Sequence, residues 1–414
     1  MYIKIILQEV SSMFKRCIGI IVSLLLLTNM LTVFADNRGE NETDEIIYEY
    51  FNAINEQNWD AVIQLSADSE DMATFISNAT EKVGILTIED VDVKSLVQVS
   101  PENSINYNSN YDNFGDLQVG YLIGLDTKVS DETKYFYDGF NLYLLILVQT
   151  EGNWGVLEFS QATPDLIKAT YTTRTRSSDP NIDKVLDALE KRKHGIFTNL
   201  DGDVLEENIA TEEQLIEENG GKQRNTTRIK GNQFDRPDTL RVYLNAGYPV
   251  NVSYYDWTKV VLFQGFGANF IYKNDVYGAY LGQGLPMASL EAGAQAVKAR
   301  GWYGFHFPLH ASKGADVSSS SYGNYFIGAA THDRCTQAIN NVSGILPVSS
   351  DWNVFPAQWA DSTHTWTTQG KGTGQMYQSG TWYWGLNNRT WQDVVHYYYG
   401  YSKWSSGAII MLYY

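Results

Sequence analysis

After residue 42, the apolar positions first follow the period of a helix. They recur three and four residues apart on a polar background, at Ile46, Ile47, Tyr50, Phe51 and Ile54. Thr43 or Asp44 stands where such a helix would be capped. A second short helix is predicted from Trp59, because Val62 and Leu65 continue the same spacing.

The pattern then changes to short apolar runs bounded by turn residues, which predict strands. Four strands are expected, at Val91–Val99, Gln118–Leu125, Asn141–Val148 and Gly155–Phe159. The stretch "TEGNWG" predicts a hairpin turn between the last two. Helices followed by an antiparallel meander resemble the nuclear transport factor 2-like cone fold over residues 43–162. We identify no catalytic set of residues in this region.

Residues 163–235 are predicted to form a helix and a linker. Asp179 is placed as an N-cap, Pro180 follows at the first helical position, and Gly195 ends the pattern. The apolar stripe of this helix indicates ordinary packing. The acidic stretch "NLDGDVLEEN" does not have the spacing of an EF-hand loop, so we expect no calcium there. Residues 196–235 are polar and are interpreted as a linker.

A different kind of helix is predicted by "EAGAQAVKARGWYGF", from Glu291 to Phe305. Its small side chains lie on one face, at Ala292, Ala296, Ala299 and, one turn on, Tyr303. Such a face lets another backbone approach closely. The neighbouring face carries Glu291, Gln295, Lys298 and Trp302. We expect that face to be solvated or to form part of a groove wall.

Composition narrows the class of protein. The chain has 414 residues, is 43% hydrophobic and has a net charge of -18, which suits a globular protein of about two domains and argues against a nucleic-acid binder. Nine of the 11 Trp lie from Trp257 onward. Aromatic rings in that density either fill a core or stack on sugar rings. Both interpretations stay open.

The N-terminus is predicted to be a secretory signal over residues 1–35. Lys15 and Arg16 precede an apolar stretch from Ile18 to Leu27, and Ala35 marks the cleavage site. The alternative is an uncleaved membrane anchor. Cleavage would remove Cys17 and leave Cys335, so no intrachain disulfide is expected. An exported chain that relies on core packing fits a Gram-positive-type cell envelope.

Several C-terminal segments, in order, resemble the stage II sporulation protein D family, the SpoIID/LytB domain. In "SLEAGAQAVKARGWYG" the residues that match its signature are Gln295, Ala296, Val297, Ala299, Arg300 and Tyr303. The segments "LRVYLN", "YYDWTKVVLFQG", "CTQAINNVSGILPV" and "GKGTGQMYQSGTWYWGLNNRTWQDVVHYYYGYS" also match. The resemblance covers about residues 238–414 and implies an α+β domain over residues 236–414.

The family resemblance implies a role on peptidoglycan glycan strands, by lytic transglycosylation or by modulation of a cell-wall amidase. The reaction needs one carboxylic acid, yet Gln264 stands at the family's Glu position, and an amide cannot exchange that proton. Glu291 or Asp256 could serve instead. Glycan-binding candidates are assigned at Gln295, Arg300, Trp302, Lys371, Gly372, Gly374 and Gln378.

No metal or other cofactor is expected. Some family members hold zinc through Cys and His, but here Ser318–Ser321 and Gly323 stand where thiols would be. His306 and His310 have the spacing of two ligands on a helix, but Pro308 between them argues against a helix. Both are therefore interpreted as surface or loop residues.

The sequence thus predicts an exported α+β protein of two domains, a cone-like domain and a SpoIID/LytB-like domain, that works at the cell wall. Two functions compete. One is a glycan-binding or amidase-modulating module, and the other is an active lytic transglycosylase with a relocated acid. An unrelated surface or adhesion module is a third alternative. No nucleic acid is expected as a partner, and a membrane contact is expected only through an uncleaved signal segment.

Overall fold

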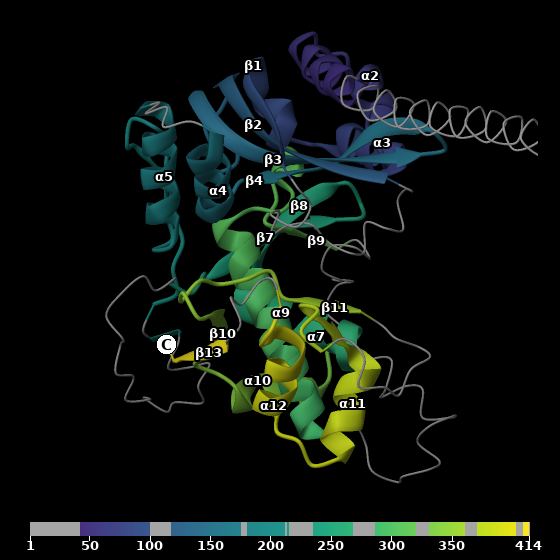
Figure 1. The fold of residues 1–414 in the computed structure, drawn as a ribbon, viewed down its shortest axis with the longest axis vertical. Helices are drawn as coiled ribbons and strands as arrows, with labels where there is room; N and C mark the ends of the chain where they lie inside the picture. Colours follow the sequence, from purple (N-terminus) through teal and green to yellow (C-terminus); the bar gives the residue numbers. More distant parts are fainter. Residues whose placement is uncertain are drawn as a thin grey trace, which may run out of the picture.

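The computed structural model describes residues 42–99, 117–174, 180–211, 213–214, 235–267, 286–319, 331–360, 371–402 and 409–413. Helices and strands both occur in runs along the chain, so the mixed α+β class is confirmed. Figure 1 shows the elements spread along one long axis, with a four-stranded sheet at one end and a group of helices at the other. Within the described ranges, no helix is both long and apolar enough to cross a membrane.

The four predicted strands form one antiparallel sheet in the order β1-β2-β3-β4. Each observed strand contains the predicted one and extends beyond it: β1 (Ile88–Val99), β2 (Leu117–Val129), β3 (Gly139–Thr150) and β4 (Asn153–Gln161). The β3–β4 hairpin turns at Glu151 and Gly152, which have φ of 53° and 86°. The turn predicted from "TEGNWG" is confirmed.

Helices cover both faces of this sheet (Figure 1). On one face, Ile123 and Leu145 share a buried cluster with the helix of residues 42–55, α2 (Trp59–Gln64) and α3 (Ser69–Asn78). On the other face, Leu144 packs against α4 (Pro164–Arg174) and α5 (Pro180–Arg192). Coverage on both sides explains why β3 reads as a continuous apolar run and not as an alternating one. The first two helices and α5 match the sequence prediction.

The predicted linker contains ordered structure, so that prediction is wrong for residues 196–211. They include a hairpin of β5 (Ile196–Thr198) and β6 (Val204–Glu207). Asn199 closes its turn, because its side-chain oxygen accepts from the N–H groups of Asp201 and Asp203 at 3.1 and 3.0 Å. The calcium-like composition of this stretch is therefore that of a turn that caps its own backbone.

A three-stranded sheet lies between the four-stranded sheet and the helical end (Figure 1). Its order is β8 (Tyr248–Ser253), β7 (Thr239–Leu244) and β9 (Val317–Ser318), with β9 parallel to β7. The segment "LRVYLN", which resembles the family, lies on β7. The parallel partner β9 comes more than seventy residues later in the chain.

The helical end is built around α9 (Met287–His306), which the predicted Ala-rich helix matches. The elements packed on it are α7 (Tyr254–Leu262), the π-helical turn η4 (Phe263–Gly267), α10 (Asp333–Asn341), α11 (Gln378–Leu386) and α12 (Trp391–Tyr399). Two short sheets complete this end, β10 (Ile345–Ser349) with β13 (Ile409–Tyr413), and β11 (Gln358–Ala360) with β12 (Gln375–Tyr377).

Every residue of α9 from Ala292 to His306 is buried. A Cβ on Gly293 would lie 2.7 Å from the ring of Phe266, and one on Gly304 would lie 2.9 Å from the carbonyl oxygen of Asp316. Small residues therefore serve close packing all around the helix, not on one face. The prediction of a solvated or groove-lining polar face is wrong from Gln295 onward, since partners surround the helix on all sides.

The chain after α9 returns to the four-stranded sheet. The N–H of Gln161 donates to the carbonyl of Pro308 at 3.0 Å, and the turn η6 (Ala311–Lys313) lies against β4. His306 is buried, with its ring nitrogens at the carbonyl oxygens of Arg192 and Asp235. His310 is partly buried. The interpretation of both histidines as surface or loop residues is wrong for His306, which ends α9 inside the protein.

Candidate functional site

The structure places Gln264 in η4, at the end of α7, with a partly exposed side chain. A Cβ on the next residue, Gly265, would lie 3.1 Å from the indole nitrogen of Trp359 and 3.8 Å from the amide nitrogen of Gln378. Phe266 then packs on Trp359, with ring centroids 6.2 Å apart. Two predicted site residues, Gln264 and Gln378, are thus brought to the same place from segments more than a hundred residues apart.

Gln378 begins α11 and is buried. Its carbonyl accepts a hydrogen bond from the Thr381 hydroxyl at 2.7 Å, and that hydroxyl is also 2.6 Å from the hydroxyl of Ser289 on α9. One hydrogen bond between α11 and α9 therefore helps to hold the start of α11, which carries Gln378, against α9.

The glycine-rich loop approaches a neighbouring helix. The N–H groups of Gly372 and Gly374 each donate at 3.0 Å to the carbonyls of Tyr397 and Tyr398 on α12. Their φ angles of 68° and 80° lie in the left-handed region that glycine adopts readily. Lys371 is exposed, with its ammonium 5.8 Å from the ring centroid of Tyr401. The N–H groups of these two glycan-binding candidates are therefore used on α12.

Three predicted glycan-binding side chains lie in the interior. Trp302 is fully buried and packs edge to face on Tyr254, with centroids 6.2 Å apart. Arg300 is 6% exposed, and its positive charge interacts with the carboxylate of Glu158. Gln295 is fully buried, and neither of its amide atoms has a hydrogen-bond partner among the described residues. As placed here, none of the three lines an open groove, because α9 is enclosed by other elements.

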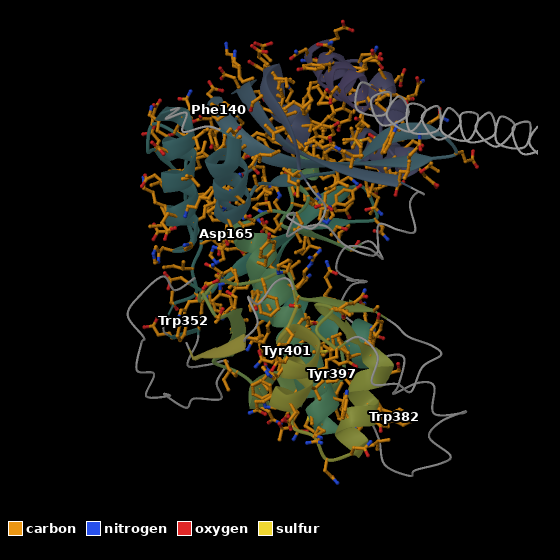
Figure 2. The ribbon with its side chains drawn as sticks, viewed as in Figure 1. Phe140, Asp165, Trp352, Trp382, Tyr397 and Tyr401 are labelled. Atoms are coloured by element: carbon orange, nitrogen blue, oxygen red, sulfur yellow. The ribbon has the colours of Figure 1, made fainter. Side chains whose placement is uncertain are left out.

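Most described aromatic residues of the C-terminal half belong to the core. Trp257, Trp302 and Trp382 are buried, and Figure 2 shows Trp382, Tyr397 and Tyr401 at the helical end of the molecule. Four further tryptophans are partly exposed at the edge of that core: Trp352, Trp359, Trp384 and Trp391. Of the two interpretations of the aromatic residues, core filling holds for the buried ones, and the four at the edge retain a face toward solvent.

Glu291 is placed differently from the rest of its helix. It lies in the second turn of α9, partly exposed, and its carboxylate accepts a hydrogen bond from Asn341 at 2.7 Å. It lines a cavity of about 430 Å³ between the start of α9 and the connection from α11 to α12. We call this cavity the Glu291 cleft. Its other polar and aromatic lining residues are Asn388, Arg389, Thr390, Trp391 and Gln392.

Asp256, the alternative to Glu291 as the acid, is not among the residues that line this cleft. It is exposed in the first turn of α7 and pairs with Lys259 at 2.6 Å. Among the described residues, no three side chains of His, Cys, Asp or Glu gather as a metal site would require. Ser318 and Ser319 are buried in or beside β9, while Ser320, Ser321 and Gly323 fall outside the described residues.

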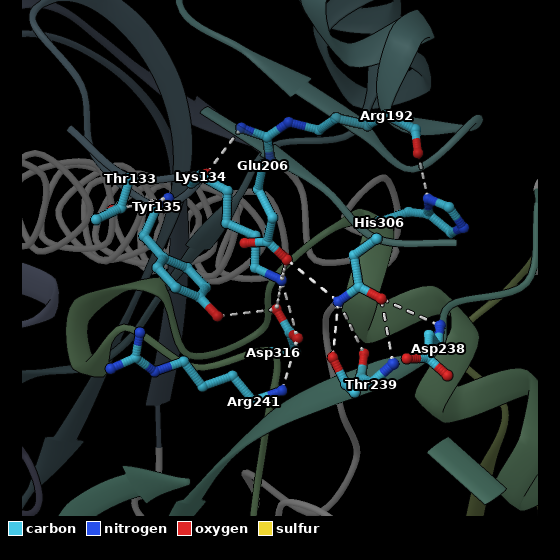
Figure 3. A network of polar contacts seen from close by, with 11 residues as sticks. Thr133, Lys134, Tyr135, Arg192, Glu206, Asp238, Thr239, Arg241, His306 and Asp316 are labelled. Carbon is cyan, nitrogen blue, oxygen red and sulfur yellow. Dashed lines mark hydrogen bonds and ion pairs between the residues drawn. The ribbon is translucent and has the colours of Figure 1, made fainter. Parts of the chain in front are cut away.

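A second polar site was not expected from the sequence. Figure 3 shows the side chains of Lys134 and Tyr135 and the backbone N–H of Arg241 at the carboxylate of Asp316. The ammonium of Lys134 lies 3.1 Å from the carboxylates of both Asp316 and Glu206. The Tyr135 hydroxyl and the backbone N–H of Arg241 donate to Asp316 at 3.1 and 2.9 Å. Local sequence patterns carry no signal for this cluster, because its members come from separate elements.

The chain was compared with protein-family models, curated proteins and solved structures, and none of the three comparisons found a match.

Proposed function

We propose that this chain is an exported cell-wall protein that binds peptidoglycan glycan strands through its C-terminal half. The observation that carries the proposal is the Glu291 cleft, which lies at the start of the helix that bears the SpoIID/LytB-like signature. The order of the other matching segments supports the same assignment. The signal-like N-terminus supports export to a Gram-positive-type envelope.

We further propose the two-domain arrangement that the sequence suggests. A cone-like domain over residues 43–162 is supported by the meander β1 to β4, with helices at its start and on its faces. A SpoIID/LytB-like domain over residues 236–414 is supported by the position of α9 at the centre of the surrounding helices. A cell-wall amidase as a partner remains a prediction.

The chemistry of the Glu291 cleft suits a sugar polymer. Glu291 can accept hydrogen bonds from hydroxyl groups, and Arg389, Asn388 and Gln392 can donate them. Trp391 supplies a partly exposed ring on which the face of a sugar can pack. A volume of about 430 Å³ lies within the range of small-ligand sites. A few directed polar groups beside one aromatic face would orient a glycan without a deep pocket.

Catalysis is the second candidate function, and the position of Glu291 favours it. Transglycosylation needs one carboxyl group, which protonates the glycosidic oxygen as the bond to the anomeric carbon breaks. The resulting carboxylate then accepts the proton of the sugar's own 6-hydroxyl as that oxygen attacks the same carbon. Of the three positions considered for catalysis, Gln264 carries an amide with no acidic proton to give, and Asp256 lies outside the cleft. Of these three residues, Glu291 is the one that lines the Glu291 cleft.

The test compares binding and cleavage of denuded peptidoglycan. Wild type should co-sediment with the glycan, and Trp391→Ala should weaken binding by about 5- to 10-fold, since loss of a ring contact costs about 1 kcal/mol. Asp256→Asn is the matched control, because it changes an exposed carboxylate of the same half outside the cleft. Trp391→Ala binding equal to wild type would contradict the Glu291 cleft as the glycan site.

Cleavage is read from anhydro-sugar products by mass spectrometry. If Gln264 has replaced the acid in an intact site, Gln264→Glu should gain about 10²- to 10⁴-fold in rate over wild type. If the acid has moved, wild type should cleave and Glu291→Gln should lose activity by a similar factor while Asp256→Asn retains it. Wild type that neither binds nor cleaves the glycan would overturn the proposal.

A further inference from the structure

A polar cavity of about 580 Å³ lies beside the Asp316 network, remote in the sequence from the Glu291 cleft. The loop between β2 and β3, the end of β6 and the strands β7 and β8 form its walls. Its charged side chains are Lys134, Glu206, Glu207, Asp238 and Arg241, and its amides are Asn208 and Asn251. We call it the β6–β7 cavity. Nothing in the proposed glycan function uses it.

One wall of the cavity is held by buried charges (Figure 3). The side chains of Lys134 and Asp316 are 2% and 0% exposed, whereas Glu206 is 33% exposed and reaches the cavity. The Lys134 ammonium also lies 4.6 Å from the ring centroid of Phe305. The buried ammonium of Lys134 therefore holds the Glu206 carboxylate from the side of the protein interior. Buried ion pairs cost desolvation energy and add little net stability, so their position against a cavity points to a functional site.

The charge of the cavity is unbalanced. Lys134 and Arg241 bring two positive charges to its lining, and Glu206, Glu207 and Asp238 bring three negative ones. This count leaves Asp316 out, and an ionised Asp316 would make the excess larger. The excess acidity lies on the β6 side, where Glu206 and Glu207 are adjacent. A positively charged group of a ligand is favoured there.

The opposite wall has donors. Arg241 and Asn251 are directly paired across β7 and β8, so their side chains leave the same face of this ribbon. The Arg241 guanidinium uses one nitrogen on Glu81, at 2.9 Å, and retains further N–H groups. A guanidinium beside a carboxamide suits a carboxylate. Ile209 adds an aliphatic surface between the two walls.

We propose that the β6–β7 cavity binds a zwitterionic ligand, a free amino acid or a short peptide. Its ammonium lies at Glu206 and Glu207, its carboxylate lies at Arg241 and Asn251, and its side chain contacts Ile209. A sugar is disfavoured, because the aromatic ring in this lining, Tyr135, is itself 3% exposed and offers no stacking face.

The test is calorimetric titration of the full mature chain with four probes. These are alanine, the dipeptide Ala-Ala, N-acetyl-Ala-Ala, and Ala-Ala with a C-terminal amide. Ala-Ala should bind. Either blocked dipeptide should bind at least about 10-fold more weakly than Ala-Ala, because each block removes one charge-assisted contact. Equal or tighter binding of alanine would assign the ligand to a single amino acid within the same class.

Two variants locate the contacts. Glu207→Gln should weaken the binding of Ala-Ala about 10-fold but leave the binding of N-acetyl-Ala-Ala unchanged. Arg241→Gln should weaken the binding of every probe except Ala-Ala with a C-terminal amide. Glu89→Gln, an exposed carboxylate on β1, is the matched control and should bind as wild type. The proposal is overturned if wild type binds none of the probes, if blocked and free dipeptides bind equally, or if Glu207→Gln matches the control. The probe series on wild type still decides the matter if Arg241→Gln fails to fold.

Discussion

Glu158 lies in β4 with only 8% of its surface exposed, and its Oε1 atom has no hydrogen-bond partner among the described residues. Burial raises the pKa of its carboxyl group to about 8, against the opposing effects of Arg300 and a hydrogen bond with Ser160. A cavity of about 30 Å³ beside it has room for one water molecule. A single residue can therefore make the stability of this protein depend on pH.

Glu158→Gln should flatten that dependence. The folded-state pKa lies above the unfolded value of 4.5, so the stability from the protonated group is fully present below about pH 4.5 and is lost as pH rises toward 8. Wild type should lose about 1 kcal/mol per pH unit between pH 5 and 8, relative to the variant. Denaturant unfolding at several pH values measures this. Equal slopes for wild type and Glu158→Gln would refute the assignment, and Glu89→Gln controls for loss of an exposed carboxylate.

At the scale of the element, α9 shows how small residues set the spacing of helices. Its Gly301 lies directly against the indole ring of Trp257 on α7, with no room for a Cβ. Lys298, on the same helix, donates to the carbonyls of Val342 and Ile345 at 2.9 and 2.5 Å. Those carbonyls follow α10, so a buried lysine on α9 caps the end of a neighbouring helix. The helix is therefore held by steric fit on one side and by hydrogen bonds on another.

In Gly301→Ala the added methyl group must displace the fully buried Trp257, at a steric cost of about 1–3 kcal/mol. The gain in helix propensity is about 1 kcal/mol, so the protein should be destabilised by up to about 2 kcal/mol. Chemical unfolding measures the difference. Combining Gly301→Ala with Trp257→Phe, which shortens the ring system, should cost less than the sum of the two single changes. Strict additivity would show that the two residues do not compete for the same space.

At the scale of the whole molecule, polar contacts at Asp316 join the four-stranded sheet to the three-stranded sheet. Lys134 and Tyr135 come from the loop after β2, while Asp316 precedes β9 and also accepts from the backbone of β7. Burial raises the pKa of Asp316, and Lys134 opposes that rise. Ala311 begins η6 and Ala315 follows it, and both belong to the same buried cluster as the four-stranded sheet, whereas the helical end has a buried cluster of its own. The interior of the four-stranded sheet therefore extends into the segment that follows α9.

Lys134→Met should destabilise the protein by about 3–5 kcal/mol at neutral pH, because it leaves a buried carboxylate without its counter-ion. The loss should grow as pH rises, since protonation of Asp316 relieves it at lower pH. Lys134→Met with Asp316→Asn should recover part of the loss, whereas Lys94→Met, at an exposed lysine, should have little effect. Calorimetry of the three variants tests this. A single change at Lys134 as mild as the one at Lys94 would contradict the role of the pair.

Local patterns predicted the strands of the four-stranded sheet and several helices correctly, whereas elements such as α3, α4 and α10 were not predicted. The helix of residues 42–55, the four strands, α5 and α9 all follow from periodicity, turn residues and caps, because these depend on neighbours within one or two turns of the chain. The hairpin of β5 and β6 was missed, since its strands are short and polar. Its closing contact is an asparagine side chain, a weak signal in any sequence.

The sequence by itself determined the α+β class, the order of the first two helices and the four strands, and the place of Glu291 on the Ala-rich helix. Only the tertiary structure decided which polar residues are exposed. Gln295 and Lys298 read as a polar face, yet both are buried, because a helix rich in alanine and glycine has no apolar contrast to mark its inner side. The Lys134–Asp316 pair spans 182 residues, and its geometry exists only once the separate elements have packed together.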